Sequence, residues 1–434
     1  MSPKYFYKKI KEIQQVCNFV ADSSCSKFYN SFYKRKGFVP SDVTSYEDFL
    51  KVPLLNKDDV LETSLKERNY LPVRDTKGFS ITSGTTKNKK ILMLPFSHPS
   101  KSFAKSITNP DKMKNLGVTK IIYVTSPLHG MVRHMIYATK NSVPFVLSKP
   151  DNLVLSANMI KEAGIEGIIS TPTILELLIV ELTNLGINRQ IRWVCLAGEH
   201  CSKQKRDLMK KSLPNADIEM VYGSAEAGII GVQCEEIKKE TNCFHPAEEV
   251  FLEVLNENGN PEKEATPGNV VITTLTKSAF PLIRYQINDM ATVQYKPCKC
   301  GALSTFTLLG RSDFDSIKVQ GTLIHTEAVE RALSMISKDV ETDYRLSVYE
   351  KRVNNKMLPE LIIELIPLDK LIANPDEFRQ TITETISKNL WLSPRKTLND
   401  LVKANVFLPL RVKLVDGIEK NPNGKTKSII NFTI

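Results

Sequence analysis

The chain has 434 residues, enough for two or three domains, and its 41% hydrophobic and 25% charged residues are typical of a globular protein with a sizeable core. Its formal net charge of +11 is spread along the whole sequence, which favours a solvated basic surface over a dedicated site for an acidic partner. The charged N-terminal segment MSPKYFYKKIKEIQQ lacks the apolar core of a secretory signal, and no apolar run is long enough to span a bilayer, so we expect a cytoplasmic protein that does not act at a membrane.

The N-terminal segment is expected to be helical. Apolar residues recur at helical spacing between Tyr5 and about Tyr33, which predicts helix docked on the core, with a membrane-surface helix as the alternative. A turn around Pro53 and a further helix that starts near Asn56 are predicted next.

From about Lys120 onward, short apolar runs alternate with helical stretches. Strands are predicted in the segments TKIIYVTSP, SVPFVLSK, GIEGIISTP, IRWVCLAGE and DIEMVYGSAEAG. Strands that alternate with helices indicate βαβ units. We therefore predict an α/β fold whose large N-terminal domain holds mostly parallel sheet flanked by helices.

The texture becomes all-β after Gly231, and residues 232–308 are predicted to form a β-rich subdomain that includes VFLEVL, GNVVITTLT and ATVQYK. Beyond a connector, EAVERALSMI predicts a helix, LIIELIPL and VKLVD predict strands, and a further helix is expected near Asp376–Leu390. We therefore expect an N-terminal domain over residues 1–311 and a small α+β C-terminal domain over residues 312–434.

Two loops carry features of phosphate binding. Residues 80–90, SITSGTTKNKK, combine hydroxyls and lysines with Gly84, which lets a backbone approach an anion closely. Taken alone, such a loop is more often a solvated turn. Near the C-terminus, Gly424–Thr426 resembles the end of a Walker loop, but Glu419 stands where that loop needs a glycine. The segment is better explained as an exposed turn that presents Lys425.

The segment Tyr222–Glu226, YGSAE, lies where a predicted strand ends. Ligands of open α/β sheets bind outside the carboxyl ends of the strands. Glu226 is a candidate for holding Mg²⁺, which takes one or two carboxylates together with phosphate oxygens. A capping serine and an exposed glutamate explain the residues equally well when the segment is considered alone.

A group of cysteines suggests a metal site. In a reducing compartment the 8 cysteines are thiols or metal ligands. Cys298 and Cys300 share one turn, while Cys234 and His245 lie upstream with Cys243 between them. Three cysteines and one histidine form a known structural zinc set. Unrelated buried cysteines remain the alternative.

The order of these segments is more specific than any one of them. From about Tyr46 to Lys425 the chain resembles the acyl-adenylate-forming superfamily, and within it the phenylacetate–CoA ligase branch. Gln286, Ile287 and Asn288 depart from the Arg-Thr-Gly that is usual before the aspartate. The segments that carry the resemblance are FLKVPLLNKDDV, TSGTTKNKK, AGEH, YGSAE, PLIRYQIND, GRSDFDSIKVQG and NPNGK, and a CxCG also recurs in zinc-bearing members.

The resemblance implies an AMP-forming acid–thiol ligase. Such an enzyme activates a carboxylic acid with ATP and Mg²⁺ to an acyl-adenylate, then transfers the acyl group to a thiol, here expected to be coenzyme A, with the zinc in a structural role. The residues that the resemblance assigns to the nucleotide are Thr82, Ser83, Gly84, Thr85, Thr86 and Lys90 around the triphosphate, Gly198, Glu199, Tyr222, Gly223 and Ser224 near the adenine, Asp289 and Arg311 at the ribose, and Glu226 at Mg²⁺.

The resemblance also implies a mobile C-terminal domain. Lys425 would bridge the carboxylate and the α-phosphate during adenylation. A rotation about a hinge at Asp313 would then replace it with the loop that contains Lys318 and Gly321, next to which the thiol arrives. The residues implied for the acid pocket are Tyr123, Leu128, His129, Gly130 and Ala197, an apolar set that favours an aryl or hydrophobic acid.

Other functions stay open at this point. The acceptor could instead be a carrier-protein phosphopantetheine or an amine. A zinc-containing nucleic-acid-binding protein is the distant alternative, and it would need a basic face with aromatic residues, for which Phe28–Lys36 is the nearest candidate. We expect no nucleic-acid partner and either a monomer or a homodimer.

Overall fold

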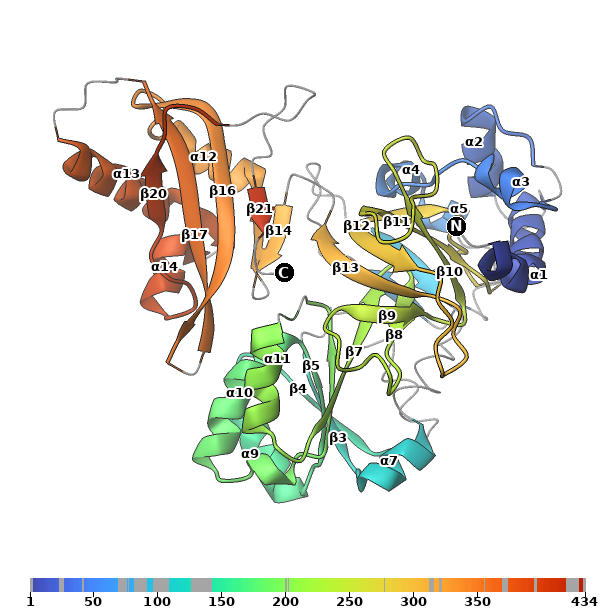
Figure 1. The fold of residues 1–434 in the computed structure, drawn as a ribbon, viewed down its shortest axis with the longest axis horizontal. Helices are drawn as coiled ribbons and strands as arrows, with labels where there is room; N and C mark the ends of the chain where they lie inside the picture. Colours follow the sequence, from blue (N-terminus) through green and yellow to red (C-terminus); the bar gives the residue numbers. More distant parts are fainter. Residues whose placement is uncertain are drawn as a thin grey trace. The chain divides into compact units, whose positions relative to one another are not determined.

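The computed structural model describes residues 3–22, 27–40, 43–68, 76, 78–81, 92–96, 109–125, 143–199, 201, 203–276, 278–311, 316–319, 322–354, 356–368, 374–393, 396–418 and 429–431. The chain divides into two compact units, Met1–Gly198 with Met209–Leu309, and Glu199–Leu208 with Gly310–Ile434 (Figure 1). Within the described ranges, no helix is long and apolar enough to cross a bilayer.

An eleven-stranded mixed sheet forms the centre of the first unit, in the order β10-β11-β12-β13-β9-β8-β7-β6-β5-β3-β4. The strands from β4 to β7 are parallel, and β8 joins them antiparallel. This arrangement confirms the predicted α/β class. The parallel strands are β3 (Ile121–Val124), β4 (Phe145–Ser148), β5 (Gly167–Ser170), β6 (Trp193–Ala197) and β7 (Asp217–Ser224).

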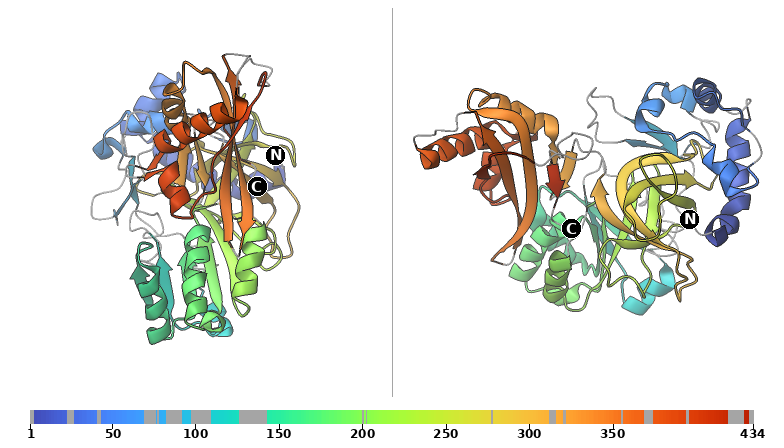
Figure 2. Two further views of the ribbon diagram at one scale, coloured as in Figure 1. Left: turned by 90° about the vertical axis from the view of Figure 1, so that its left-hand side faces the viewer. Right: turned by 45° about the horizontal axis from the view of Figure 1, so that its top comes forward.

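The parallel strands are built from nearly unbroken apolar runs because both of their faces are covered. Helices α9 (Leu153–Ala163) and α10 (Pro172–Asn184) lie along one face, whereas α7 (Pro110–Leu116) lies on the other (Figures 1 and 2). Thr171 caps α10 through its side chain, directly after β5 ends. Short helix α11 (Lys203–Ser212) and the 3₁₀ turn η2 (Asn188–Gln190) precede β7 and β6 in the chain.

The β-rich region continues the same sheet rather than forming one of its own. Strand β11 pairs antiparallel with β10 and β12, and β9 pairs antiparallel with β13 on one side and β8 on the other. Gly231 in β8 has to be glycine, since a Cβ would stand 2.6 Å from the ring of Phe306. The strands are β8 (Gly228–Val232), β9 (Cys243–Pro246), β10 (Val250–Leu255), β11 (Gly268–Thr274), β12 (Tyr285–Gln294) and β13 (Thr305–Arg311).

The N-terminal helices pack on this β-rich region. Phe6 is fully buried, and its ring lies 5.7 Å from that of Phe251 in β10. The helix predicted near Asn56 is present, because Asn56 caps it in a capping box with Asp59. The elements of this segment are α1 (Pro3–Ala21), α2 (Lys27–Arg35), α3 (Tyr46–Leu50), α4 (Lys57–Leu61), α5 (Leu65–Arg68), and the hairpin of β1 (Gly78–Ile81) and β2 (Met93–Phe96).

A buried ion pair joins the N-terminal segment to the sheet. Arg284 donates from Nε to Glu253 Oε2 at 3.1 Å and from Nη2 to Glu253 Oε1 at 3.2 Å, and both side chains are at most 2% exposed. The Arg284 Nη1 also donates to the carbonyls of Leu50 and Val52, at 2.8 and 2.9 Å. Tyr46 donates its hydroxyl to the same Glu253 carboxylate, at 3.1 Å. Every charge of the pair is therefore matched by hydrogen bonds, as buried charges require.

The second unit is the α+β structure predicted for the C-terminal part, with a sheet in the order β20-β17-β16-β21. Its core joins α12, α13 and α14 to one face of the hairpin β16–β17, where Leu346, Val348, Leu361 and Ile363 are buried. The elements are β14 (Ser316–Val319), β15 (Thr322–His325), α12 (Thr326–Ser334), β16 (Val340–Val353), β17 (Lys356–Pro367), α13 (Pro375–Asn389), β18 (Trp391–Ser393), β19 (Lys396–Thr397), α14 (Leu398–Lys403), β20 (Arg411–Leu414) and β21 (Ile429–Asn431).

Arg284→Met should lower the free energy of unfolding by about 3–5 kcal/mol, because it leaves the Glu253 carboxylate buried without its counter-charge. Urea denaturation followed by circular dichroism measures the effect. The control is Arg379→Met, which removes the same group from the exposed pair with Asp376 on α13 and should leave the midpoint nearly unchanged. Equal effects of the two variants would contradict a special role for the buried pair.

Candidate active site

The segment YGSAE comprises the last three residues of β7 and the start of the tight turn that leads to β8, at the carboxyl edge of the parallel strands. A Cβ at Gly223 would stand 2.5 Å from the carbonyl oxygen of Gly228, so this position admits only glycine. Ser224 Oγ accepts a hydrogen bond from the amide of Ala227 at 3.1 Å, which stabilises the turn. Glu226, on this turn, makes no hydrogen bond or ion pair with another described residue, and Gly198 after β6 adopts a left-handed φ of 82°.

Tyr222 and Asp289 meet beside this turn. The hydroxyl of Tyr222 donates to Asp289 Oδ2 at 2.5 Å, although the two residues are 67 positions apart in sequence. The ring of Tyr222 packs against those of Phe244 and Phe306, with centroids 6.1 and 5.8 Å away, and these two rings also contact each other. A rigid aromatic ring and a carboxylate thus share one place, which is where the sequence analysis expects an adenine and a ribose.

The backbone around Asp289 explains the departure from the usual motif. Asn269 pairs with Met290 and Val271 pairs with Gln286, so a step of two residues in β11 corresponds to a step of four residues in β12. The extra residues form a bulge in β12, and Asp289 lies within it. Asn288 within it has a left-handed φ of 66°. Glycine and asparagine adopt this conformation most readily, so asparagine can replace the usual glycine without changing the bend. Bulges of this kind redirect side chains next to active sites.

Several expected site residues lie beyond these contacts. Tyr123 and Ala197, which the resemblance assigns to the acid pocket, are buried in β3 and β6. The backbones of Arg311 and Lys318 lie in β13 and β14, but the structure does not describe their side chains. The residues that fall outside the described ones are the phosphate-loop residues Thr82, Ser83, Gly84, Thr85, Thr86 and Lys90, the pocket residues Leu128, His129 and Gly130, the hinge Asp313, and Gly321 and Lys425.

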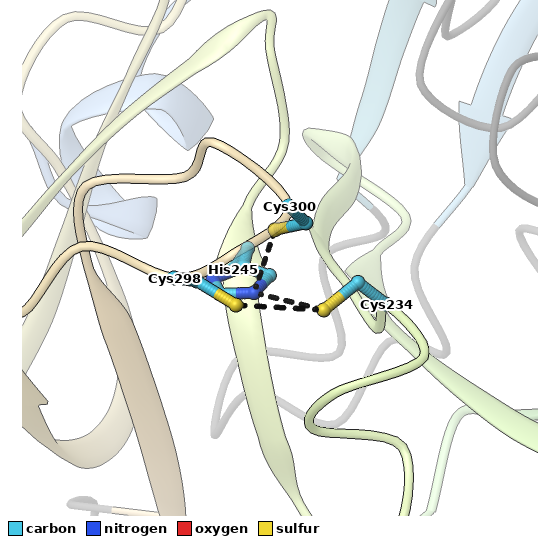
Figure 3. A group of neighbouring side chains, drawn as sticks. All are labelled: Cys234, His245, Cys298 and Cys300. Carbon is cyan, nitrogen blue, oxygen red and sulfur yellow. Dashed lines mark hydrogen bonds between the residues drawn. The ribbon is translucent and has the colours of Figure 1, made fainter.

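The four metal-ligand candidates converge, as Figure 3 shows, and their ligand atoms all lie within 4.8 Å of one another. Nε2 of His245 is 3.3 Å from the sulfur of Cys234 and 3.4 Å from that of Cys300, and the sulfurs of Cys234 and Cys298 are 3.8 Å apart. Cys234 follows β8, His245 lies in β9, and the two other cysteines share the turn between β12 and β13. Two strand connections and strand β9 thus supply one cluster.

The surroundings favour the metal-binding forms of His245 and Cys298, whereas burial raises the pKa of the Cys300 thiol to about 11. His245 Nδ1 is 2.7 Å from the carbonyl oxygen of Ser304, so Nδ1 carries the proton and Nε2 keeps its lone pair for the cluster. Burial lowers the pKa of His245, which favours the neutral, ligating form. The backbone amide of Cys300 lowers the pKa of the Cys298 thiol. Cys243 is not a member of the group.

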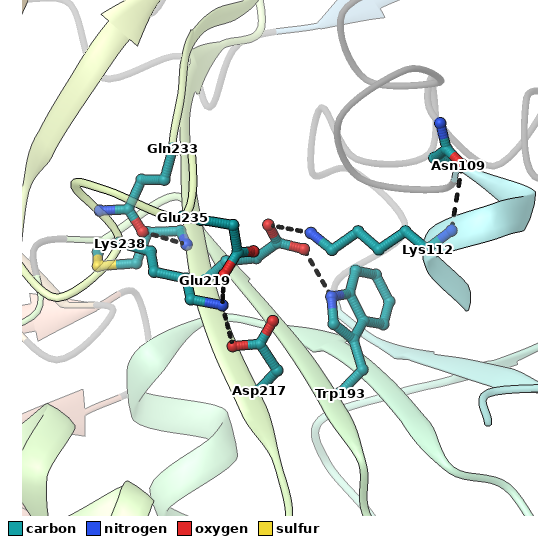
Figure 4. A network of polar contacts seen from close by, with 9 residues as sticks. Asn109, Lys112, Trp193, Asp217, Glu219, Gln233, Glu235 and Lys238 are labelled. Atoms are coloured by element: carbon teal, nitrogen blue, oxygen red, sulfur yellow. Dashed lines mark hydrogen bonds and ion pairs between the residues drawn. The ribbon is translucent and has the colours of Figure 1, made fainter. Parts of the chain in front are cut away.

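A second polar network was not expected from the sequence (Figure 4). In β7, Glu219 receives Lys112 from α7 at 2.6 Å and the indole of Trp193 at 2.5 Å, and its pKa is raised because it is fully buried. Next to it, Lys238 bridges Asp217 and Glu235. Because Lys238 lies in the turn that follows Cys234, the network ties the metal-ligand cluster to the parallel strands.

The segment that favoured a nucleic-acid function is part of the core instead. Phe28, Tyr29, Phe32 and Tyr33 are all buried in α2, with at most 4% exposure. Their rings contact one another and Phe280, so they cannot stack on bases.

The sequence is similar to a family of known enzymes and to characterised relatives. A family model described as AMP-binding enzyme matches residues 35–276. The chain is 25% identical over 428 residues to a phenylacetate-coenzyme A ligase of Thermus thermophilus, with 93% of this chain and 92% of the relative covered. It is 21% identical over 421 residues to a phenylacetate-coenzyme A ligase of Aromatoleum evansii, with coverage of 93% and 89%.

Solved structures share the fold. A crystal structure of 2-hydroxyisobutyryl-CoA ligase, in complex with 2-HIB-AMP and CoA, matches with a TM-score of 0.64 and 17% identity, over 99% of this chain and 90% of the other. An amide bond synthetase from Marinactinospora thermotolerans matches with a TM-score of 0.50 and 15% identity, over 84% of this chain and 70% of the other. The chain therefore shares the fold of these two solved structures, as predicted.

Asn288→Val should lower the free energy of unfolding by about 1–2 kcal/mol, because a β-branched residue resists a left-handed backbone, and it should weaken nucleotide binding by displacing Asp289. Asn288→Gly keeps the backbone conformation and should bind nucleotide as the parent chain does. Urea denaturation and isothermal titration with ATP measure the two effects. Equal losses in both variants would mean that the asparagine amide, not the bend, is what matters.

Proposed function

Because the chain belongs to the AMP-binding enzyme family, we propose that it activates a carboxylic acid with ATP as an acyl-adenylate and transfers the acyl group to coenzyme A. The resemblance to the phenylacetate–CoA ligase branch agrees with the relatives, and the predicted ligase activity follows from it. The observation that carries the proposal is the contact of Tyr222 with Asp289, since it brings two separate motif segments together at the carboxyl edge of the sheet.

The chemistry of adenylation explains why such a site consists of groups that position the reactants and offset their charge. A carboxylate has to attack the α-phosphate of ATP, and both are anions, so the barrier is largely one of repulsion and positioning. We propose that the ring of Tyr222 flanks the adenine and that Asp289 accepts hydrogen bonds from the ribose hydroxyls. Glu226 would hold Mg²⁺, which offsets phosphate charge when bound. No covalent enzyme intermediate is needed, so no nucleophilic cysteine is expected.

Two half-reactions at one carbonyl call for two arrangements of the C-terminal domain. We propose that the domains part at residues 311 and 312, with Asp313 as the hinge. In the first arrangement Lys425 binds the carboxylate and the α-phosphate together. In the second, the loop with Lys318 and Gly321 replaces it and lets the thiol reach the adenylate. These four residues enter by the resemblance of their motifs.

The cluster of Cys234, His245, Cys298 and Cys300 fits zinc in its chemistry. Three thiols and one imidazole are the soft donors that a structural zinc takes, and they fill its four positions. We propose that zinc binds there and, when bound, fixes the connections after β8 and β12 to β9. Because no open position remains, the metal would stabilise the fold and not act on the substrate.

Lys425→Ala should abolish adenylate formation, because the mutant lacks the cation that brings the two anions together. A panel of carboxylic acids in ATP–pyrophosphate exchange measures this half-reaction. A supplied acyl-adenylate should still react with coenzyme A, which thioester analysis detects. Lys388→Ala, at an exposed lysine of α13, is the control and should keep both half-reactions.

Other outcomes would overturn parts of the proposal. Normal adenylation by Lys425→Ala would remove the assigned role. Exchange without thioester formation from coenzyme A would favour a carrier-protein or amine acceptor. If no acid in the panel supports exchange by the parent chain, the proposed function itself is wrong.

Protein purified without chelator should contain one zinc per chain by elemental analysis. Cys298→Ser should lose the metal and lower the melting temperature, because a structural zinc contributes directly to folding. Activity should fall only as far as the folded fraction falls. Cys243→Ser alters a nearby half-buried thiol outside the cluster and should keep the metal. A metal content well below one per parent chain would rule the site out.

A further inference from the structure

Two hydroxyl groups at the carboxyl end of β3 are buried, and neither makes a hydrogen bond to another described residue. The side chain of Tyr123 is fully buried and that of Thr125 is 5% exposed. Among the residues that the structure describes, neither the Tyr123 hydroxyl nor Thr125 Oγ1 has a hydrogen-bond partner. Buried polar groups are nearly always paired, so two such hydroxyls two residues apart need an explanation.

The sheet register places both groups near the predicted acid pocket. Tyr123 is level with Ile169 of β5, which is level with Cys195 of β6. Because successive side chains of a strand alternate between faces, Tyr123 and Thr125 share one face, and Ala197 lies on that face too. Thr125 directly follows β3, and Ala197 ends β6, so both lie at the carboxyl edge where ligands of such sheets bind. Tyr123 lies one row below them.

Hydroxyls on the opposite face of the same strands are all paired with protein groups where the structure describes them. Ser170 Oγ donates to the carbonyl oxygen of Val124 at 2.9 Å, and the hydroxyls of Ser148 and Ser156 are 2.7 Å apart. The helices α9 and α10 cover that face. The fold thus pairs the described hydroxyls on the face that the helices cover, and leaves those of Tyr123 and Thr125 buried without a described partner on the other face.

The unpaired phenol sits in apolar surroundings. The ring of Phe145 meets that of Tyr123 edge-on, with centroids 5.6 Å apart, and Cys195 is a neighbour on β6. Burial raises the pKa of Tyr123, so the phenol keeps its proton and can donate as well as accept. A plain hydrocarbon group placed there would leave both hydroxyls unpaired.

We propose that Tyr123 and Thr125 bind a polar substituent of the acid substrate, so that the enzyme selects an aryl or medium-sized carboxylic acid with a hydroxyl group remote from its carboxylate. This proposal rests on the proposed function and narrows its substrate class from any hydrophobic acid to a hydroxylated one. A site with buried groups that await a hydrogen bond discriminates strongly against an analogue that cannot supply it. Tyr123 and Thr125 are then specificity-determining residues.

Matched acids test the proposal in ATP–pyrophosphate exchange. Each pair differs by one hydroxyl: phenylacetic with 3- and 4-hydroxyphenylacetic acid, and benzoic with 3- and 4-hydroxybenzoic acid. At least one hydroxylated acid should show a kcat/KM roughly ten- to a hundredfold above that of its parent, the effect of one well-placed buried hydrogen bond. Activity with the parent acids and no preference in any pair would overturn this inference but leave the proposed function intact. No activity with any acid would overturn both.

Variants separate recognition from packing. Tyr123→Phe and Thr125→Val should each lower the ratio of kcat/KM for the preferred hydroxylated acid to kcat/KM for its parent acid toward one. Ser170→Ala removes a buried hydroxyl from the neighbouring strand on the opposite face, and should leave the ratio unchanged even if it lowers stability. An unchanged ratio in both Tyr123→Phe and Thr125→Val would overturn the assignment.

A stability measurement checks the premise itself. Because the hydroxyl of Tyr123 is unpaired in the free protein, Tyr123→Phe should raise the melting temperature of the chain without acid, whereas Ser170→Ala, which loses a made hydrogen bond, should lower it. Addition of the preferred acid with ATP should stabilise the parent chain more than Tyr123→Phe. A lower melting temperature for free Tyr123→Phe would mean that the hydroxyl already has a partner, and the proposal would fail.

Discussion

The buried pair of Arg284 and Glu253 is the contact on which the rest of the first unit depends. Taking two charges out of water is costly, and it is offset here because the guanidinium also binds the carbonyls of Leu50 and Val52 while Tyr46 binds the carboxylate. These hydrogen bonds fix residues 46–52 to strand β10 and to the start of β12, which are far away in sequence. Glu253 lies in β10, and Arg284 directly precedes β12, so the pair sets where β12 begins.

That starting point determines two sites along one strand. Near the start of β12, the left-handed backbone of Asn288 and the bulge turn Asp289 toward Tyr222. After its end, Cys298 and Cys300 reach His245 on β9. A displacement of β12 would therefore disturb both the proposed nucleotide site and the metal-ligand cluster. The network around Glu219 and Lys238 also supports the metal-ligand cluster, because it fixes the turn that follows Cys234 to the parallel strands.

Much of this could be predicted from the sequence, and the reasons for the exceptions are physical. Apolar runs between helical segments predicted the parallel strands, and the positions of the cysteines and of His245 predicted the metal-ligand cluster. Strand β16 was missed because its charged residues, such as Glu341 and Arg352, interrupt the apolar pattern. The buried pairs were missed because a sequence does not say which charges meet. A signal was present, however, since Glu253 in VFLEVL and Glu219 in DIEMVY are single charges inside apolar strands.

A polar residue in an apolar strand is informative only when its partner is known. Glu219 proves to be satisfied by Lys112 and Trp193, so its burial is explained by the fold alone. Tyr123 lies in an equally apolar strand, and the sequence allows it to be counted simply as an aromatic core residue, which is why the pocket was expected to be apolar. Only the register and the hydrogen bonds distinguish a hydroxyl that the fold satisfies from one that it leaves for a ligand. The hydroxyls of Tyr123 and Thr125, which have no partner among the described residues, are therefore the groups that we propose for substrate recognition, where composition suggested only packing.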